Sequence, residues 1–581
     1  MDTTEVKEQK AKQDAWEAAF FIENHLDHTA YPDEVAHPEQ VSFMVYLQPG
    51  ERYYPCAEGM FRTLTQKENI VDLDYRYQKV FSGILHLVDS ILTDPEKKLF
   101  LKCLLEIKFR HETRDRLMIP SRLEKRLFQI FLNQTGISDP FFAVKISRNE
   151  RAAAILASEA FKKAFDFMDS AETCSLAPTS LGGIRSELDE MEMKRLLLLS
   201  GASELWLEKE ALVSEDDFHG IFQRPLTGDT EAFFNSVGIL GKERGRPKKI
   251  LWLGDEAGEI LFDLKIISFL IRMGHKVVLS LKDKSFFTKV DFSDILDDAI
   301  LHEALEGDRI LSDLSVSKNA LVDILRREKN LVVISDGTRE NINLLLASTT
   351  FARVFKEMDF VVARGEDQRR RLFDNPFQFT RPIFSLTSGE NGAVRIALKP
   401  AHPDMIRFSH IDLEKKAKEI ICAMKEASGK GMAVMFYSGI IGSIPGKIDE
   451  AKKLMGVIIG HLRETLAETF IINPSQHYEK GMDADDLMYM WEIVQRSGYI
   501  NIWRFQTYDD IALAFSLMGQ KVPPEWVGKD ATYSTGCTKE MHIAQDVQKK
   551  NPEMQISGPP PEKFMRRKDY GVGKMYDKIL G

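Results

Sequence analysis

Cysteine is scarce and scattered in this sequence of 581 residues. There are five cysteines, Cys56, Cys103, Cys174, Cys422 and Cys537, and no two of them form a CxxC pair. Disulfide-stabilised domains and cysteine zinc sites both need a denser or more regular spacing, so neither is predicted. This pattern favours a reducing compartment, and we expect a cytoplasmic protein.

Long apolar runs and an excess of positive charge are also missing. The most apolar stretches, such as IISFLI (266–271), are much shorter than the roughly 20 residues that span a bilayer, and residues 1–21 lack the apolar core of a signal peptide. Lys and Arg number 78 against 88 Asp and Glu, a net charge of −10. We therefore expect no membrane partner, and the acidic net charge argues against a nucleic-acid partner. The basic run RGRPKK (244–249) resembles a minor-groove arm, but a single copy is more typical of a solvated linker.

What the sequence does contain is typical of a folded protein with several domains. The length is several times the usual domain of roughly 100 to 200 residues, and 44% hydrophobic and 29% charged residues are ordinary globular values. The patterns predict a helical amino-terminal domain (1–220), a connector (221–249), an α/β domain that holds the site (250–400) and a smaller carboxyl-terminal α/β domain with an extended tail (401–581). The oligomeric state stays open.

The fold class follows from alternating strand-like and helix-like segments after residue 249. Short apolar runs alternate with stretches of helical apolar spacing, which is the pattern of βαβ units. In the middle third the strand-like runs are ILWL (250–253), KVVLSL (276–281), NLVVISDG (330–337), DFVVARG (359–365) and RPIFSL (381–386). A second alternation includes GMAVMFYSG (431–439), ETFIINPS (468–475) and INIWRFQTY (500–508). We predict an α/β protein with a central, mostly parallel, doubly wound sheet and a second, smaller α/β region.

The most informative stretch is LWLGDEAGEILFD (251–263), in which a strand ends at Asp255 and Glu256 and a helix follows. Ligands of parallel sheets bind beyond the carboxyl ends of the strands, and adjacent carboxylates there can hold a divalent cation. Capping of the helix by one of these residues explains the pattern equally well.

Four segments together resemble the damage-control phosphatases, the domain of unknown function 89 superfamily. They are TGISDPFFAVKISRN (135–149), GDEAGEILFD (254–263), VVISDGT (332–338) and DFVVARGEDQRRRLF (359–373), and they occur in the family's order. The resemblance covers roughly residues 100–390. It implies a divalent metal, Mn, Co, Ni or Mg, that acts on a small phosphorylated molecule.

The resemblance also implies a set of site residues. The metal ligands would be Asp255, Glu256 and Asp291, and the catalytic residues Asp255, Glu256 and Arg364. Phosphate and substrate would be bound by Ser335, Gly337, Arg364, Gly365, Gln368, Lys145 and Asn149.

Three departures from the family pattern bear on activity. The family's metal-binding Asn is Glu256 here, and its Lys-Gly-x-x-Asn element has become Arg364-Gly365-x-x-Gln368. At the simplest alignment Lys289 takes the place of the third metal ligand, and Asp291 serves only if the loop shifts its register. A lysine at that position can replace the cation.

Three functions are therefore open. The first is a metal-dependent phosphatase-like protein that hydrolyses a small phosphorylated metabolite. The second is a degenerate member that binds a phosphorylated ligand or a protein without turnover. The third, a carboxyl methyltransferase that uses S-adenosylmethionine, depends only on what the family resemblance implies.

The carboxyl-terminal third offers two weaker candidates. FYSGIIGSIPGKID (436–449) fails the Walker pattern because Ile441 and Ile448 stand where glycine and Ser/Thr are needed, so a plain turn is favoured. Cys537 precedes an expected helix that also carries His542, which is compatible with an activated thiolate, although a small buried cysteine is the commoner case.

Overall fold

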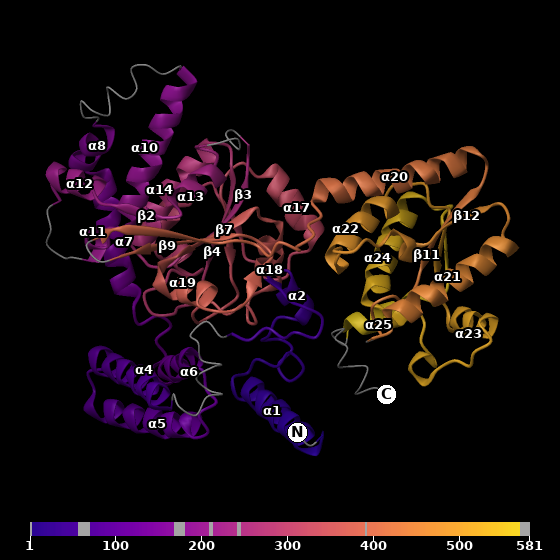
Figure 1. Ribbon diagram of the computed structural model, residues 1–581, viewed down its shortest axis with the longest axis horizontal. Helices are drawn as coiled ribbons and strands as arrows, with labels where there is room; N and C mark the ends of the chain where they lie inside the picture. Colours follow the sequence, from indigo (N-terminus) through magenta and orange to yellow (C-terminus); the bar gives the residue numbers. More distant parts are fainter. Residues whose placement is uncertain are drawn as a thin grey trace. The chain divides into compact units, whose positions relative to one another are not determined.

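The computed structural model describes residues 3–55, 70–167, 181–207, 213–240, 246–389, 392–444 and 446–569. Residues 244 and 245 of the RGRPKK run lie outside the described residues. The chain divides into two compact units, Met1–Asp404 and Met405–Gly581. Each unit is built around its own sheet (Figure 1).

The sheet of the first unit has eight strands in the order β2-β10-β9-β7-β3-β4-β6-β5. Neighbouring strands are parallel throughout, except that β10 runs antiparallel to β9. The strands are β2 (Leu226–Gly228), β3 (Lys249–Leu253), β4 (Lys276–Leu281), β5 (Arg309–Leu311), β6 (Val332–Ser335), β7 (Phe360–Arg364), β9 (Ile383–Ser388) and β10 (Val394–Lys399). The predicted mostly parallel sheet is confirmed.

Both faces of this sheet are buried, which explains why its central strands contain runs of consecutive apolar residues. Alternate residues of a strand point to opposite faces. Ile250 and Trp252 of β3 belong to one apolar cluster, with residues of α10 (Leu181–Gly201) and α14 (Glu259–Arg272). Leu251 and Leu253 belong to another, with residues of α17 (Lys318–Arg327) and α18 (Thr349–Glu357). The sheet is therefore doubly wound, as the alternation predicts.

Three helices near the amino terminus form a small core of their own. α4 (Ile70–Ile91), α5 (Pro95–Thr113) and α6 (Pro120–Thr135) share an apolar cluster that also takes in Phe286, from the segment after β4. The ring of Phe128 on α6 stacks on Phe287 with 4.9 Å between centroids. The segment after β4 is thus held between the sheet and these helices.

The remaining elements of the first unit are short or peripheral. The helices are α1 (Thr3–Glu23), α2 (Pro38–Ser42), α7 (Phe142–Ala157), α8 (Glu159–Asp166), α11 (Glu204–Leu207), α12 (Glu215–Phe222), α13 (Thr230–Ser236), α15 (Asp294–Asp297), α16 (Ala299–Ala304) and α19 (Gly365–Phe373). Strands β1 (Val45–Tyr46) and β8 (Gln378–Phe379) pair antiparallel. Residues 221–249, expected as a connector, include β2 and α13, and β2 pairs with β10 at the edge of the sheet. The finer division of this unit into domains stays a prediction.

The second unit has four parallel strands in the order β12-β11-β13-β14. They are β11 (Ala433–Ser438), β12 (Thr469–Ile472), β13 (Ile502–Phe505) and β14 (Gln555–Ser557). The helices are α20 (His410–Gly429), α21 (Ile448–Thr465), α22 (Ala484–Gln495), α23 (Tyr508–Leu517), α24 (Thr535–Lys550) and α25 (Pro561–Asp569), with short 3-10 turns at Pro474–His477, Pro524–Trp526 and Ala531–Tyr533. The predicted additional α/β region is confirmed. Among the described residues of the chain, no helix is long and apolar enough to cross a membrane.

Candidate functional site

The turn that follows β3 carries two of the predicted site residues, Asp255 and Glu256. The segment after β4 runs beside this turn, because the Val290 N–H donates to the Asp255 carbonyl at 2.9 Å. Glu256 and Lys289 form an antiparallel bridge in the same place. This pairing of two backbones brings Lys289 to the two carboxylates.

The ammonium of Lys289 forms the centre of an acidic cluster. Its Nζ lies 2.7 Å from Asp255 Oδ1, 2.9 Å from Glu256 Oε1 and 3.6 Å from Asp367 Oδ2. The Lys289 side chain is only 9% exposed. The Thr288 hydroxyl donates to Glu256 Oε2 at 2.6 Å and fixes the second carboxylate. We call Asp255, Glu256 and Lys289 the strand-end cluster.

The positive charge of Lys289 is stable in this environment. Burial acts to lower the pKa of Lys289, but the carboxylates of Asp255 and Glu256 outweigh it and hold the pKa above its usual value. Burial also raises the pKa of Asp255 to about 7, against the opposite effect of Lys289. The strand-end cluster therefore contains a permanent internal cation at neutral pH.

Gly365 and Gln368 pack against the same strand end. Gly365 begins α19 with φ +79°, and a Cβ on it would lie 2.2 Å from Asp255 Oδ2. A side chain at this position would displace the carboxylate, so the close approach requires glycine. Gln368 donates from Nε2 to the Gly254 carbonyl at 3.1 Å, while its Oε1 has no hydrogen-bond partner among the described residues.

Arg364, predicted to bind phosphate, lies in an internal ion-pair network. Its Nη2 lies 2.7 Å from Glu259 Oε1 and donates to the Ser200 carbonyl at 2.8 Å. Its Nε donates to Asp263 Oδ2 at 3.1 Å, and the guanidinium is buried. Asp263 also accepts from the Trp252 indole at 2.9 Å. Through these contacts Arg364 joins β7 to α10 and α14.

Lys145 occupies a second acidic cluster. Its Nζ lies 2.7 Å from Asp139 Oδ2, 2.8 Å from Asp291 Oδ2 and 2.7 Å from Asp294 Oδ2, and its side chain is 2% exposed. Burial acts to lower the pKa of Lys145, but Asp291 and Asp294 raise it above its usual value. Lys145 joins α7 to the segment after β4.

Asn149 lies one helical turn after Lys145 and makes a similar connection. Its Nδ2 donates to Asp298 Oδ2 at 2.7 Å, and its Oδ1 accepts from the Gly258 N–H at 2.6 Å. Through these contacts Lys145 and Asn149 link α7 to the segments that follow β3 and β4. The predicted contact of the two residues with substrate stays a prediction.

The structure does not bring the predicted metal ligands Asp255, Glu256 and Asp291 together as one set. Among the described residues, the acidic groups whose oxygens all lie within 4.8 Å of one another are Asp139, Asp291 and Asp294. A divalent cation needs carboxylate oxygens directed at it. In both clusters a lysine ammonium lies among these oxygens, so a divalent ion would have to displace Lys289 or Lys145.

Ser335 and Gly337 lie at the end of β6, two strands away from β3. The Ser335 hydroxyl donates to Asp283 Oδ1 at 3.2 Å and accepts from the Gly337 N–H at 3.0 Å. Gly337 lines a cavity of about 640 Å³ together with Thr338 and Arg339. Gly337 therefore borders a cavity, whereas Arg364 lies in the buried network described above.

The sequence analysis missed three residues that contact the strand-end cluster, Arg148, Thr288 and Asp367. Arg148 Nη1 lies 3.1 Å from Glu256 Oε2. Its position three residues after Lys145 was a usable signal, because residues three apart share one face of a helix.

Cys537 of the second unit is buried and uncharged. Its Sγ donates to the Gly439 carbonyl at 3.3 Å. Burial and then the neighbouring Glu540 raise the pKa of Cys537 well above its usual value. These conditions oppose a reactive thiolate. His542 lies on the same helix, α24.

A comparison with known protein families identifies the same family as the sequence motifs do. Residues 51–395 match the family described as the damage-control phosphatase ARMT1-like domain. A solved structure of a DUF89 family protein from Pyrococcus horikoshii is 17% identical, covers 55% of this chain and 96% of its own chain, and has a TM-score of 0.39. No curated protein matches the chain. The resemblance predicted from the motifs is confirmed, and the chain belongs to the damage-control phosphatase ARMT1-like domain family.

Proposed function

We propose that this protein binds a small phosphorylated molecule at the carboxyl edge of its central sheet and does not hydrolyse it through a divalent metal. Membership of the family supports a phosphatase-like role. The observation that carries the proposal is the position of Lys289, whose Nζ lies 2.7 Å from Asp255 and 2.9 Å from Glu256.

A lysine ammonium supplies charge but not the chemistry of a metal. A bound divalent ion orients substrate and lowers the pKa of a coordinated water, which produces a nucleophile at neutral pH. An ammonium donates hydrogen bonds and has no coordination position for water. With Lys289 in place, the strand-end cluster keeps a positive charge but has no group that activates water in this way.

The metal-dependent phosphatase remains a second candidate, favoured by one observation. Asp139, Asp291 and Asp294 are close enough to share an ion, and they lie beside the segment that carries Lys289. This candidate requires that Lys145 leave these carboxylates. No contact among the described residues favours the carboxyl methyltransferase.

The test is a metal analysis of the purified protein, followed by a panel of phosphate esters with added Mn²⁺, Co²⁺, Ni²⁺ or Mg²⁺. The variants are Lys289→Asp, which restores the family's carboxylate, and Lys265→Asp, a matched control at an exposed position of α14. We expect no stoichiometric metal and no hydrolysis in the wild type and in Lys265→Asp, and tight metal binding only in Lys289→Asp.

Stoichiometric metal in the wild type, with hydrolysis that disappears in Asp255→Ala, would contradict the proposal and support the metal-dependent phosphatase. Failure of the wild type to bind any phosphate ester would contradict the proposal that the protein binds a small phosphorylated molecule.

A further inference from the structure

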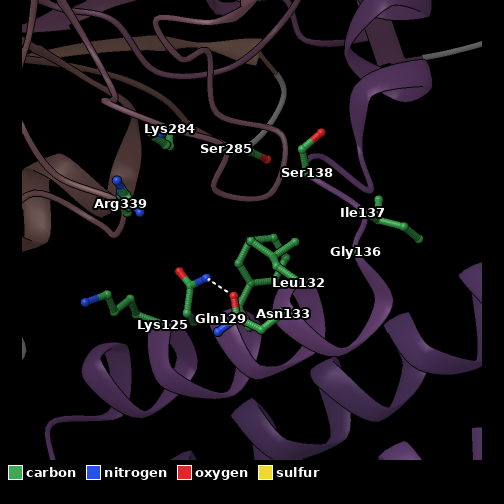
Figure 2. A pocket seen from close by; sticks show the side chains of 11 residues that line it. Lys125, Gln129, Leu132, Asn133, Gly136, Ile137, Ser138, Lys284, Ser285 and Arg339 are labelled. Atoms are coloured by element: carbon green, nitrogen blue, oxygen red, sulfur yellow. Dashed lines mark hydrogen bonds between the residues drawn. The ribbon is translucent and has the colours of Figure 1, made fainter.

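A second cavity of about 360 Å³ lies in the first unit, and neither Asp255 nor Lys289 lines it. Figure 2 shows α6 below this cavity, with Lys125 and Gln129, and the residues Lys284, Ser285 and Arg339 on the opposite side. Its volume is within the range of roughly 300 to 1,000 Å³ found for small-molecule sites.

The lining of this cavity is strongly cationic. Of the eleven described residues that line it, Lys125, Lys284 and Arg339 are positively charged and none is acidic. The whole protein has a net charge of −10, so the lining of this cavity is more positive than the protein is on average. A concave surface lined by one sign of charge attracts ligands of the opposite sign.

These cations are only partly neutralised by the protein. Among the described residues, neither Lys125 nor Lys284 forms an ion pair, and Arg339 lies 3.6 Å from Asp283. Burial, followed by the charge of Arg122, lowers the pKa of Lys125. An anion at this place would lie beside an ammonium that has lost part of its hydration and has no carboxylate partner.

The cavity also offers an unused hydroxyl. Ser285 is 8% exposed, and its Oγ has no hydrogen-bond partner among the described residues. A buried hydroxyl normally finds a partner, so a polar ligand atom would satisfy it. Gln129 and Asn133, which are hydrogen-bonded to each other at 2.8 Å, add amide groups to the same lining.

The wall that carries Lys284 and Ser285 is held firmly. Phe287, two residues after Ser285, has φ +52°, which is uncommon for a residue with a bulky side chain. Its ring stacks on Phe128 of α6, and such backbone conformations persist where the surroundings fix them. The two walls of the cavity are therefore locked together by the aromatic contact beside it.

We propose that this cavity binds the phosphate group of a small organic phosphate, with Lys125, Lys284 and Arg339 as its charged ligands and the Ser285 hydroxyl as a further partner. The inference rests on the proposed function for the choice of a phosphorylated ligand, and it assigns to this ligand a site that the strand-end cluster does not include. Apolar side chains of Phe128, Leu132 and Ile137 line the same cavity and suit the carbon skeleton of the ligand.

The test measures binding by titration calorimetry on the full chain, with inorganic phosphate, glycerol 3-phosphate and citrate as probes. The variants are Lys125→Gln, Lys284→Gln and the double variant, and the matched control is Lys108→Gln, at an exposed position of α5. Loss of one charged hydrogen bond weakens binding by about tenfold or more, so we expect that loss in each single variant and a larger one in the double variant. The control should bind as the wild type does.

The outcomes separate this inference from the proposed function. Phosphate ester binding that persists unchanged in the folded double variant overturns the cavity assignment and leaves the proposed function standing. Binding of citrate without either phosphate compound overturns the choice of ligand. A wild type that binds none of the probes contradicts both proposals. Lys284 is exposed, so Lys284→Gln tests the cavity even where the variant at the half-buried Lys125 unfolds.

Discussion

Replacing Lys289 by methionine should destabilise the first unit strongly at neutral pH. The change removes the ammonium that lies 2.7 Å from Asp255 and 2.9 Å from Glu256 but keeps an unbranched apolar side chain. Removal of one partner of a buried ion pair typically costs about 3 to 5 kcal/mol, because the other charge stays buried without compensation. We expect a loss in this range in the free energy of unfolding.

Added metal should distinguish a substituted metal site from an ordinary buried ion pair. The matched control is Lys318→Met, which breaks the buried pair between Lys318 and Glu357, 2.9 Å apart. Both variants should lose stability, but Mn²⁺ should restore it only in Lys289→Met, where two adjacent carboxylates are released. A ligand at one hundred times its Kd stabilises the folded state by about 2.7 kcal/mol.

The assay is urea unfolding at pH 7, with and without Mn²⁺, in which the transition of the first unit is fitted separately from that of the second. A loss below about 1 kcal/mol in Lys289→Met would refute the buried-charge explanation. Equal rescue of both variants by Mn²⁺ would show that the released carboxylates of the strand-end cluster form no specific metal site.

Three further predictions concern separate features. Burial raises the pKa of Glu540 to about 7 from 4.5, so the free energy of unfolding of the second unit should fall by about 3 kcal/mol as the pH rises between these values. Urea titrations of this unit's transition from pH 4 to 8 should show no such fall in Glu540→Gln. Gly365→Ala should cost at least about 2 kcal/mol, because its φ is +79° and a Cβ would meet a carboxylate; an unchanged melting temperature would disprove this. In alkylation followed by peptide mass spectrometry, the exposed Cys103 and Cys422 should react quickly and the buried Cys537 only after unfolding, whereas equal rates would contradict its burial.

The central strands were predictable because burial on both faces leaves a simple pattern. ILWL at 250–253 lies within β3, and the helix expected after Asp255 and Glu256 is α14, Glu259–Arg272. The strands at the edge of the sheet show this pattern of consecutive apolar residues less clearly. β10 is flanked by glycines and prolines, was not among the predicted strand-like runs, and pairs antiparallel with β9. Partial exposure at an edge weakens the apolar pattern on which sequence prediction depends.

The candidate site was predictable where residues are close in sequence. Asp255 and Glu256 are adjacent in one motif, and the resemblance to the family, at its simplest alignment, pointed to Lys289 at the place of the third metal ligand. The contact of Lys145 with Asp291 joins residues 146 positions apart, and the pairing of Arg364 with Asp263 joins residues 101 apart. Such partners depend on how helices pack on the sheet, which local spacing does not encode.

The lysine in the strand-end cluster has a consequence for how this protein relates to its surroundings. A bound ion exchanges with solution, so its occupancy follows the supply of the metal, and chelators or competing ions can remove it. The Lys289 ammonium is made with the chain and is present once in every folded molecule. Whether manganese is scarce or cobalt is in excess, the charge that Lys289 supplies at this strand end should stay the same.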